Sequence, residues 1–395
     1  MSPSQQTTSL LHAVTLTPFY PSDQNEVDGC FIAEPLAQLR RFGIDSTVIA
    51  ASPIYYPRSR QNPAAPATWI RFPRVPGNLG LASAGYFLYA RLLPEILKLH
   101  REKPISVIHA HAALPSGHAA ALLSRSLNIP FVVTVHGLDV FNTCFLEGIP
   151  AAWRRNESIN VYRAARTVLC VSGKVQEILK AGMSPAPASI ILHNGVDPNL
   201  FSPGYAQDNA DPEILVVGTL IPSKGHELVL KALANLKPAF PRLRCHIIGE
   251  GPYHPQFEAL ASQLGVTERV QFVGRQTRAE VARAMRGCSV FALPSSNEGL
   301  GCVYLEAMSC GKPVIGCSGQ GIAEVIEDGK NGFLVPPDGL TQNGLNQLVQ
   351  VLSALLESKE MCDRIGEAAR QTILEKFTLS HQAQQLADIY REAVR

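Results

Sequence analysis

The 395-residue sequence has no long apolar run and few charged residues. None of its apolar stretches approaches the roughly 18 residues that a helix needs to cross a bilayer. The first residues, MSPSQQTTSLLHAVTL, lack a basic region and a clear cleavage site, so they do not read as a signal peptide. Charged residues make up 17% and the net charge is +2, with no dense basic stripe interleaved with aromatics. The sequence therefore argues against nucleic acid as a partner.

Cysteine pairs are also absent, because the nine cysteines are scattered with no CxxC spacing. We interpret them as reduced core thiols, which predicts a cytoplasmic protein. Neither the cysteines nor the histidines of HAH (His109 and His111) have ligand-like partners nearby, so no metal site is predicted. The charge is uneven: residues 1–200 carry 17 Lys and Arg against 12 Asp and Glu, and residues 201–395 carry 18 against 21. The weak excess of basic residues in the first half is compatible with an anionic acceptor or with peripheral contact at the inner face of a membrane.

What the sequence does contain is a regular alternation of short apolar, β-branched runs with helical patterns. The runs lie at 12–16, 46–50, 106–110, 131–135, 167–171 and 189–193, and at 213–218, 244–249, 269–274, 289–294 and 312–316. Such alternation is typical of parallel sheets covered by helices on both faces. The length favours two domains with a cleft between them. We predict an N-terminal domain (1–197), a linker rich in Pro, Gly, Asn and Asp (198–212), a second domain (213–375) and a C-terminal helix (376–395) that packs back on the first.

One stretch, NEGLGCVYLEAMSCGKPVIG, places Glu298 before a glycine-rich bend and Glu306 inside the helix that follows. The bend comes after a buried strand, where open α/β sheets bind their ligands. The helix N-terminus, approached over glycines, is suited to a diphosphate. Glu306, whose helical neighbours are uncharged, would accept ribose hydroxyls, and Glu298 would accept hydroxyls of a second sugar. The alternative is that Glu298 merely complements the helix dipole and Glu306 is simply exposed.

A second anion-binding element is predicted in EILVVGTLIPSKGHELVLKAL, where Lys224 precedes a helix and could neutralise phosphate. A solvated loop lysine is the alternative. The turn HIIGEGP is only half a dinucleotide fingerprint, because His254 stands where the third glycine would fall.

Taken together, the motifs resemble those of the family 4 glycosyltransferases. EGLGCVYLEAMSCGKPVIG resembles the E-x7-E signature, and VIHAHAALPSGHAAALL, TVHGLDV, LHNGVDPNLFSP, VGTLIPSKG, IIGEGP, VQFVGR and IEDGKNGFLVPPDG resemble family segments in the family's order. The resemblance covers nearly the whole chain. It implies the GT-B fold, in which two Rossmann-like domains face a central cleft.

The resemblance also implies roles for individual residues. Glu298 would contact the donor sugar, Glu306 the ribose and Lys224 the phosphates, while the backbone at Gly299, Leu300 and Gly301 would cradle the diphosphate. His136 of TVHG would lie near the transferred sugar, so that His136, Glu298 and Lys224 form the catalytic set.

Three further positions belong to the implied donor site. Gly29, after the first strand, would approach the diphosphate, although it could be needed only for its turn. Val273 to Arg275 would hold the base, largely through backbone groups. At position 219 the chain departs from the family, which usually has arginine there; Thr219 carries no charge, so a bidentate phosphate clamp is lost.

The implied reaction is transfer of a hexosyl unit with retention of configuration and without a metal or other cofactor. The donor would be a nucleotide diphosphate sugar, UDP-linked in preference to GDP-linked. The acceptor would be a saccharide or a lipid-linked saccharide. The resemblance favours members of the family that build cell-surface polysaccharide. The Pro-rich, basic segment 52–83 is predicted to be a long loop that forms an acceptor or membrane lip. His109, His111 and His118 are interpreted as ordinary cleft or core histidines, and Asp139 as either a turn residue or a partner of His136.

Rival functions are distinguished by what they require. A retaining glycosidase would need no phosphate cradle beside its two carboxylates. A nicotinamide oxidoreductase would need an intact G-x-G-x-x-G after a strand, which is missing. A GT-B sugar-nucleotide epimerase and a non-catalytic sugar-nucleotide-binding protein remain as alternatives, because each could share every binding residue.

Overall fold

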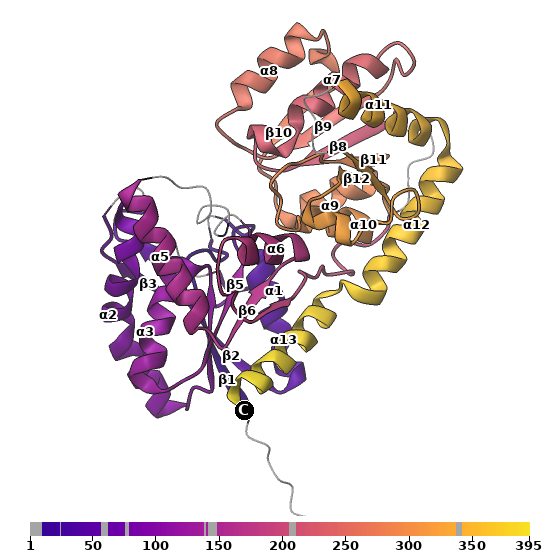
Figure 1. Cartoon of the computed structure of the whole chain (residues 1–395). Coiled ribbons are helices and arrows are strands. Elements are labelled where there is room, and N and C mark those ends of the chain that lie inside the picture. Colours follow the sequence, from indigo (N-terminus) through magenta and orange to yellow (C-terminus); the bar gives the residue numbers. More distant parts are fainter. Residues whose placement is uncertain are drawn as a thin grey trace, which may run out of the picture. The chain divides into compact units, whose positions relative to one another are not determined.

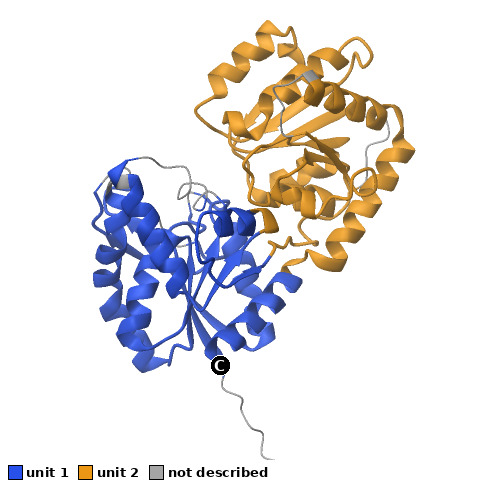
Figure 2. Cartoon of the chain, viewed as in Figure 1, with its two compact units in different colours: residues 1–171, 175–192, 380–395 blue, residues 172–174, 193–379 orange. Residues whose placement is uncertain are grey.

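The chain folds into two compact units, each built on one parallel sheet with helices on both faces (Figures 1 and 2). The computed structural model describes residues 10–23, 25–56, 62–75, 79–137, 140, 148–204, 211–336 and 342–395. Unit 1 comprises residues 1–171, 175–192 and 380–395, and unit 2 comprises residues 172–174 and 193–379. The alternating pattern thus correctly predicted two doubly wound α/β sheets.

Unit 1 contains a seven-stranded sheet in the order β3-β2-β1-β4-β5-β6-β7, with all neighbours parallel. Its strands are β1 (Leu11–Thr17), β2 (Ile44–Pro53), β3 (Thr68–Phe72), β4 (Val107–His111), β5 (Phe131–Val135), β6 (Thr167–Cys170) and β7 (Ser189–Ile191). Its helices are α1 (Cys30–Gln38), α2 (Leu79–Glu102), α3 (His118–Leu127), α5 (Ile149–Ala164), α6 (Gly173–Ala181) and α13 (Leu379–Val394). Figure 1 shows α2, α3 and α5 on one side of this sheet and α1 and α13 on the other.

The segment 52–83 corrects one expectation, since it is only partly a loop. Residues 68–72 form β3, an edge strand paired with β2, and α2 begins at Leu79. Within β3, Ile70 and Phe72 are buried while Thr68 is exposed, which is the alternation of a strand with one covered face. A five-residue strand interrupted by polar residues gives too weak a hydropathy signal to separate it from its Pro-rich flanks. Residues 57–61 and 76–78 of this segment lie outside the described residues.

Unit 2 repeats the architecture with a six-stranded parallel sheet in the order β10-β9-β8-β11-β12-β13. Its strands are β8 (Glu213–Val217), β9 (Arg244–Ile248), β10 (Val270–Gly274), β11 (Val290–Ala292), β12 (Val314–Cys317) and β13 (Phe333–Val335). Its helices are α7 (His226–Leu236), α8 (His254–Gln263), α9 (Arg278–Gly287), α10 (Cys302–Ser309), α11 (Gln342–Glu357) and α12 (Lys359–Lys376). The short edge strand β13 was not predicted.

Burial explains why the central strands read as continuous apolar runs. Every residue of β4 and β5 is buried, because parallel strands in the middle of such a sheet are covered on both faces. Cys245 and Cys288 lie in the core of unit 2, and burial raises the pKa of each thiol to about 12. No helix in the described part of the chain combines the length and apolar character needed to span a bilayer.

Each sheet has a point where the strand order reverses. In unit 2 this point lies between β8 and β11, and in unit 1 between β1 and β4. Loops that leave neighbouring strands there diverge to opposite faces, which opens a crevice at the carboxyl edge of the sheet. The sequence motifs with polar and glycine residues follow these strands. The candidate site residues therefore lie at the carboxyl edges of the two sheets.

Candidate functional site

The carboxyl edge of unit 2 gathers the lysine and the first glutamate of the two sequence motifs. After β8 the chain makes a short 3₁₀ turn, Pro222–Lys224, before α7 begins. After β11 the segment Leu293–Gly301 leads into α10. Because β8 and β11 are neighbours, residues about 75 positions apart in sequence meet at one place.

Lys224 forms a direct ion pair with Glu298, donating from Nζ to Oε2 of the carboxylate. Ser295 Oγ donates to the same oxygen at 3.3 Å. The backbone N–H of Glu298 donates to Oε1 of Gln320 at 3.1 Å, which fixes the residue from the other side. A carboxylate has about four acceptor positions, so Glu298 keeps capacity for further hydroxyl donors.

Two glycines let the backbone approach closely at this edge. Gly225 has φ +76°, and a Cβ there would come within 2.2 Å of the carbonyl oxygen of Pro294, so glycine is what allows the β8 and β11 loops to touch. Gly301, immediately before α10, has φ +85°, and a Cβ there would meet the Tyr304 ring at 2.5 Å. Glycine at position 301 therefore makes room for the Tyr304 ring where the chain enters α10, and the N-terminus of this helix is the end suited to an anion.

Glu306 has a charged partner that the sequence pattern did not reveal. Its side chain is buried, with the residue 4% exposed, and Arg278 at the start of α9 donates from Nη1 to its Oε1 at 2.6 Å. The guanidinium of Arg278 also lies over the ring of Phe201, 4.9 Å from its centroid. The carboxylate is thus held in one orientation by a cation that is itself packed against an aromatic ring.

Two more predicted donor residues lie at the same edge. Thr219, directly after the loop glycine Gly218, is exposed, and its carbonyl oxygen accepts from Nε2 of His226 at 3.0 Å. Arg275, just beyond β10, is half exposed and lies 3.4 Å from the carboxylate of Glu250 in the loop after β9. Arg275 therefore has a surface ion pair, and position 219 offers open space for a longer side chain.

In unit 1, His136 follows β5 and is packed among aromatic rings. Its ring centroid is 5.0 Å from that of Phe31 and 5.7 Å from that of Phe19. Nε2 of His136 lies 2.9 Å from Nδ1 of His111, and burial lowers the pKa of His136 to about 3. At neutral pH the imidazole is therefore neutral, with one nitrogen that donates and one that accepts.

His109 and His111 are core residues, and they form a chain of contacts behind His136. Nδ1 of His109 lies 2.6 Å from the hydroxyl of Tyr390 on α13, and Nε2 lies 2.7 Å from Oγ1 of Thr134. Burial lowers the pKa of His109 to about 3 and that of His111 well below its usual value. His111 is the member of this group that contacts His136 directly and can fix its tautomer.

Gly29 precedes α1 and has φ +70°. A Cβ at this position would lie 2.6 Å from the carbonyl oxygen of Phe19, so the backbone of the loop after β1 excludes any side chain here. The packing of this loop alone therefore requires glycine at position 29. Asp139 lies outside the described residues.

The chemistry available in unit 2 is binding of an anion beside hydroxyl groups. Lys224 and the first turn of α10 supply positive charge and N–H donors, while Glu298 and Glu306 supply acceptors for hydroxyls. Across the ranges described above, no three His, Cys, Asp or Glu side chains come together as a metal site. The residues that sequence reasoning missed are partners of those it found: Ser295, Gln320 and Arg278. Nothing in the local sequence marks Gln320 or Arg278, because each contacts a residue of a separate element. Ser295 lies three residues before Glu298 in the same segment, but a serine there has no pattern that distinguishes it from an ordinary turn residue.

Comparison with known proteins agrees with this geometry over both units. The family described as Glycosyltransferase Family 4 matches residues 31–200, and that described as Glycosyl transferases group 1 matches residues 201–372. A D-inositol 3-phosphate glycosyltransferase from Streptomyces bingchenggensis is 30% identical over 318 residues, which are 75% of this chain and 68% of that protein.

Solved structures show the same fold. Sucrose-phosphate synthase from Thermosynechococcus elongatus has a TM-score of 0.77 at 21% identity, covering 96% of this chain and 98% of that one. Anabaena HepE in complex with UDP and glucose has a TM-score of 0.74 at 20% identity, covering 97% and 100%. With both halves matched and a relative at this identity, the chain belongs to the family 4 glycosyltransferases and is a GT-B enzyme that transfers sugars from nucleotide sugars.

Proposed function

We propose that this enzyme moves a hexosyl unit from a UDP-sugar to a saccharide or lipid-linked acceptor, with retention of configuration and without a metal. The observation that carries the proposal is the ion pair of Lys224 with Glu298 beside the N-terminus of α10. An anion site and a hydroxyl-binding carboxylate in contact are what a sugar joined to a diphosphate requires. A glycosidase would need neither the lysine nor a helix N-terminus beside its carboxylates.

In this proposal unit 2 supplies the donor site. Lys224 and the N–H groups at Gly299, Leu300 and Gly301 hold the diphosphate and stabilise it as it leaves. Glu298 accepts hydroxyls of the donor sugar, and Glu306, oriented by Arg278, accepts those of the ribose. The backbone near Arg275 holds the base.

For unit 1 we propose the acceptor side, and for Gly29 and His136 contacts with the diphosphate and the transferred sugar respectively. His136 is neutral, so it can exchange hydrogen bonds with a sugar without introducing a charge. The acceptor hydroxyl passes its proton to a departing phosphate oxygen on the same face of the sugar. Such a step needs no protein nucleophile. The domain limits that we propose for these roles are 1–197 and 213–375, joined by the linker 198–212, with 376–395 as a C-terminal helix.

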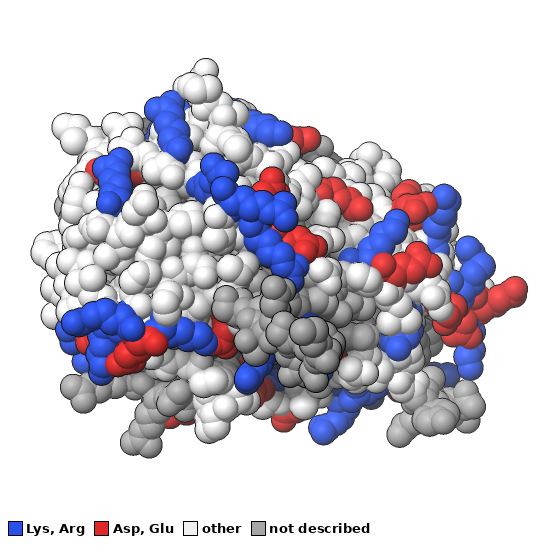
Figure 3. Space-filling model, turned by 90° about the horizontal axis from the view of Figure 1, so that it is seen from below, with Lys and Arg blue, Asp and Glu red and all other residues white. Residues whose placement is uncertain are grey.

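The UDP preference is supported by the likeness to HepE, which has been solved with UDP and glucose. A GDP-sugar is the second candidate donor, since the base is expected to be held largely through backbone groups. We propose cell-surface polysaccharide or glycoconjugate synthesis at the cytoplasmic side of a membrane as the setting. On the face seen in Figure 3, basic and acidic side chains are interspersed, so this face gives no broad basic field for anionic lipids.

The donor class is tested by ligand-induced stabilisation. UDP should raise the melting temperature of the metal-free protein, because a ligand that binds only the folded state stabilises it by about 2.7 kcal/mol at a hundredfold excess over Kd. The measurement is thermal unfolding with UDP, GDP and their sugars in the presence of EDTA. Stabilisation that requires added magnesium or manganese would count against a site built on Lys224 and α10.

Turnover separates the proposed activity from its alternatives. Incubation of the stabilising nucleotide sugar with candidate saccharide acceptors should release UDP and give a product with the donor's anomeric configuration. An epimerase would convert the nucleotide sugar without an acceptor. A non-catalytic protein would bind it and leave it unchanged.

The exposed position 219 gives a gain-of-function test. Thr219→Arg should tighten UDP binding by about 1–2 kcal/mol, near the lower end of the contribution of about 1.5–3 kcal/mol expected for a hydrogen bond to a charged group. The reason is that Thr219 is exposed beside Gly218, so a guanidinium, which the family resemblance implies at this position, has room there. Isothermal titration with UDP checks this, with Thr219→Gln as the uncharged control of similar length. Unchanged or weaker binding by the arginine variant would mean that the loop has been rebuilt around threonine.

A further inference from the structure

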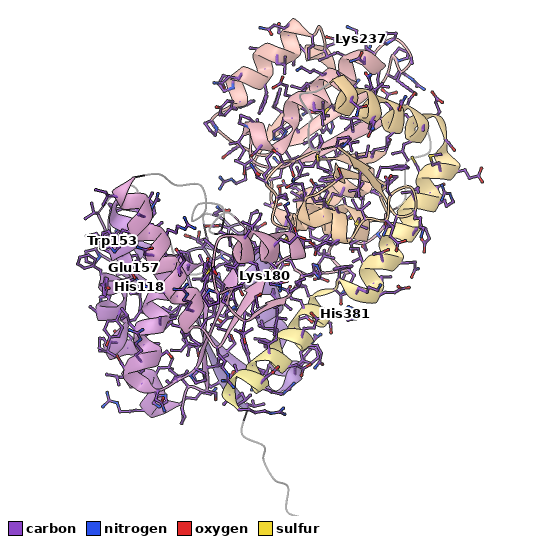
Figure 4. All side chains as sticks on the ribbon, viewed as in Figure 1. His118, Trp153, Glu157, Lys180, Lys237 and His381 are labelled. Carbon is purple, nitrogen blue, oxygen red and sulfur yellow. The ribbon has the colours of Figure 1, made fainter. Side chains whose placement is uncertain are left out.

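A cluster on the side of unit 1 that α2, α3 and α5 cover combines two exposed aromatic rings with a carboxylate. Trp153 on α5 is 41% exposed and Tyr86 on α2 is 49% exposed. Glu157 lies one turn after Trp153 on α5, and His118, at the first position of α3, lies between Glu157 and Tyr86. Figure 4 shows Trp153, Glu157 and His118 next to one another on this side of the unit.

Direct contacts hold the members of the cluster in place. Nε1 of Trp153 donates to Oε1 of Glu157 at 3.1 Å, which fixes the plane of the indole. Nε2 of His118 is 3.8 Å from Oε2 of Glu157, and the Tyr86 ring meets the His118 ring edge-on with centroids 4.5 Å apart. His118 is 5% exposed and is packed against Gly85, where an added Cβ would come within 2.5 Å of it. The buried histidine therefore lies between Glu157 and the Tyr86 ring and contacts both.

The cluster lies near the same edge of the sheet as His136. His118 begins α3 a few residues after β4 ends at His111, which contacts His136. Trp153 and Glu157 occupy the first turns of α5, the helix that follows β5 and His136. Helices that follow parallel strands begin at the carboxyl edge of the sheet, so these residues are on the side of unit 1 where an acceptor is expected.

We propose that Tyr86, Trp153 and Glu157 form a subsite for pyranose units of the acceptor, away from the hydroxyl that reacts. The inference rests on the proposed saccharide acceptor. The C–H face of a pyranose packs on a flat, fixed aromatic ring, and its hydroxyls donate to a carboxylate with acceptor positions to spare. Glu157 uses one such position for Trp153 and keeps others for the ligand.

A lipid surface fits these residues less well. Insertion of the two rings into a bilayer would carry Glu157 with them, and hydrocarbon offers no donors to the acceptor positions that Trp153 leaves unfilled. Burial lowers the pKa of His118, so this neighbour does not offset the negative charge with a cation at neutral pH. A saccharide instead supplies the donors that the carboxylate lacks.

The sequence provides its own probe, because it contains two tryptophans, Trp69 and Trp153. In the Trp69→Phe protein the fluorescence reports on Trp153 alone. We expect tetrasaccharides of glucose, mannose, galactose or N-acetylglucosamine, at millimolar concentration, to change this emission in a saturable way for at least one member of the set. In that background, Tyr86→Ala and Glu157→Gln should each weaken the apparent affinity by about tenfold. Leu97→Ala, which truncates an exposed apolar side chain further along α2, should leave it unchanged.

Each contrary outcome is informative. No response to any tetrasaccharide, or equal affinity in the Tyr86→Ala and Glu157→Gln variants, would overturn the subsite. A change in Trp153 emission with vesicles of phosphatidylcholine and phosphatidylglycerol, and with no tetrasaccharide, would also overturn it and would identify a membrane contact instead. Circular dichroism and stabilisation by UDP confirm that each variant is folded. UDP binding depends on unit 2, so a Trp69→Phe protein that binds UDP but responds to no tetrasaccharide would reject the subsite and leave the proposed donor function standing.

Discussion

Glu298→Gln is expected to reduce turnover by about 100- to 1000-fold, a range seen when a preorganised group at a reacting centre is removed. UDP affinity should remain within about threefold of wild type. The carboxylate is oriented by Lys224, Ser295 and the Gln320 contact to its own backbone, and in our proposal it accepts hydroxyls of the donor sugar. UDP itself lacks those hydroxyls, so the affinity of the variant for UDP should change little. Steady-state kinetics with the donor and isothermal titration with UDP measure the two quantities separately.

A matched control removes the same charge elsewhere in unit 2. Glu327 forms a surface ion pair with Lys330 and lies outside the site, so Glu327→Gln should leave both measurements near wild type. If Glu298→Gln weakened UDP binding as strongly as it reduced turnover, the carboxylate would serve mainly to position Lys224 against the phosphates. Our assignment of Glu298 to the sugar would then be wrong.

Glu306→Gln is expected to weaken UDP binding about tenfold or more and also to lower the stability of the free protein. The carboxylate is buried and receives a charge-assisted hydrogen bond from Arg278 at 2.6 Å. Glutamine keeps an acceptor but not the charge, so the partly buried Arg278 loses its ion pair with Glu306, at a cost of about 1–3 kcal/mol. The ribose loses a charged acceptor by the same substitution. Isothermal titration with UDP and chemical denaturation without ligand check both effects.

A double-mutant cycle tests whether the two residues act together. Arg278→Met should also weaken UDP binding, although Arg278 is not proposed to touch the nucleotide, because it orients the Glu306 carboxylate. The double variant should then lose less affinity than the sum of the single losses. Strictly additive losses would indicate that Arg278 acts on the nucleotide independently, and an unaltered UDP affinity in Glu306→Gln would remove Glu306 from the ribose site.

Sequence reasoning located much of the candidate site because its residues lie on local motifs. The buried strand before Glu298, the glycines after it and the helix that contains Glu306 are all local features, and their placement at the carboxyl edge of a parallel sheet follows from strand order. The same reasoning failed at β3 and β13, which are short edge strands. An edge strand buries fewer apolar side chains, so its sequence carries less of the pattern on which the prediction depends.

Taken by itself, the sequence determined the fold class, the family and the positions of Lys224, Glu298 and Glu306, since hydrophobic period and motif spacing are properties of neighbouring residues. Tertiary structure alone decided which groups touch. The pairing of Lys224 with Glu298, of Arg278 with Glu306 and of His111 with His136 joins residues on different strands and helices. These contacts depend on how the elements pack, and no local pattern records them. The orientation and electrostatic balance of each proposed site residue is therefore a consequence of the packed sheet.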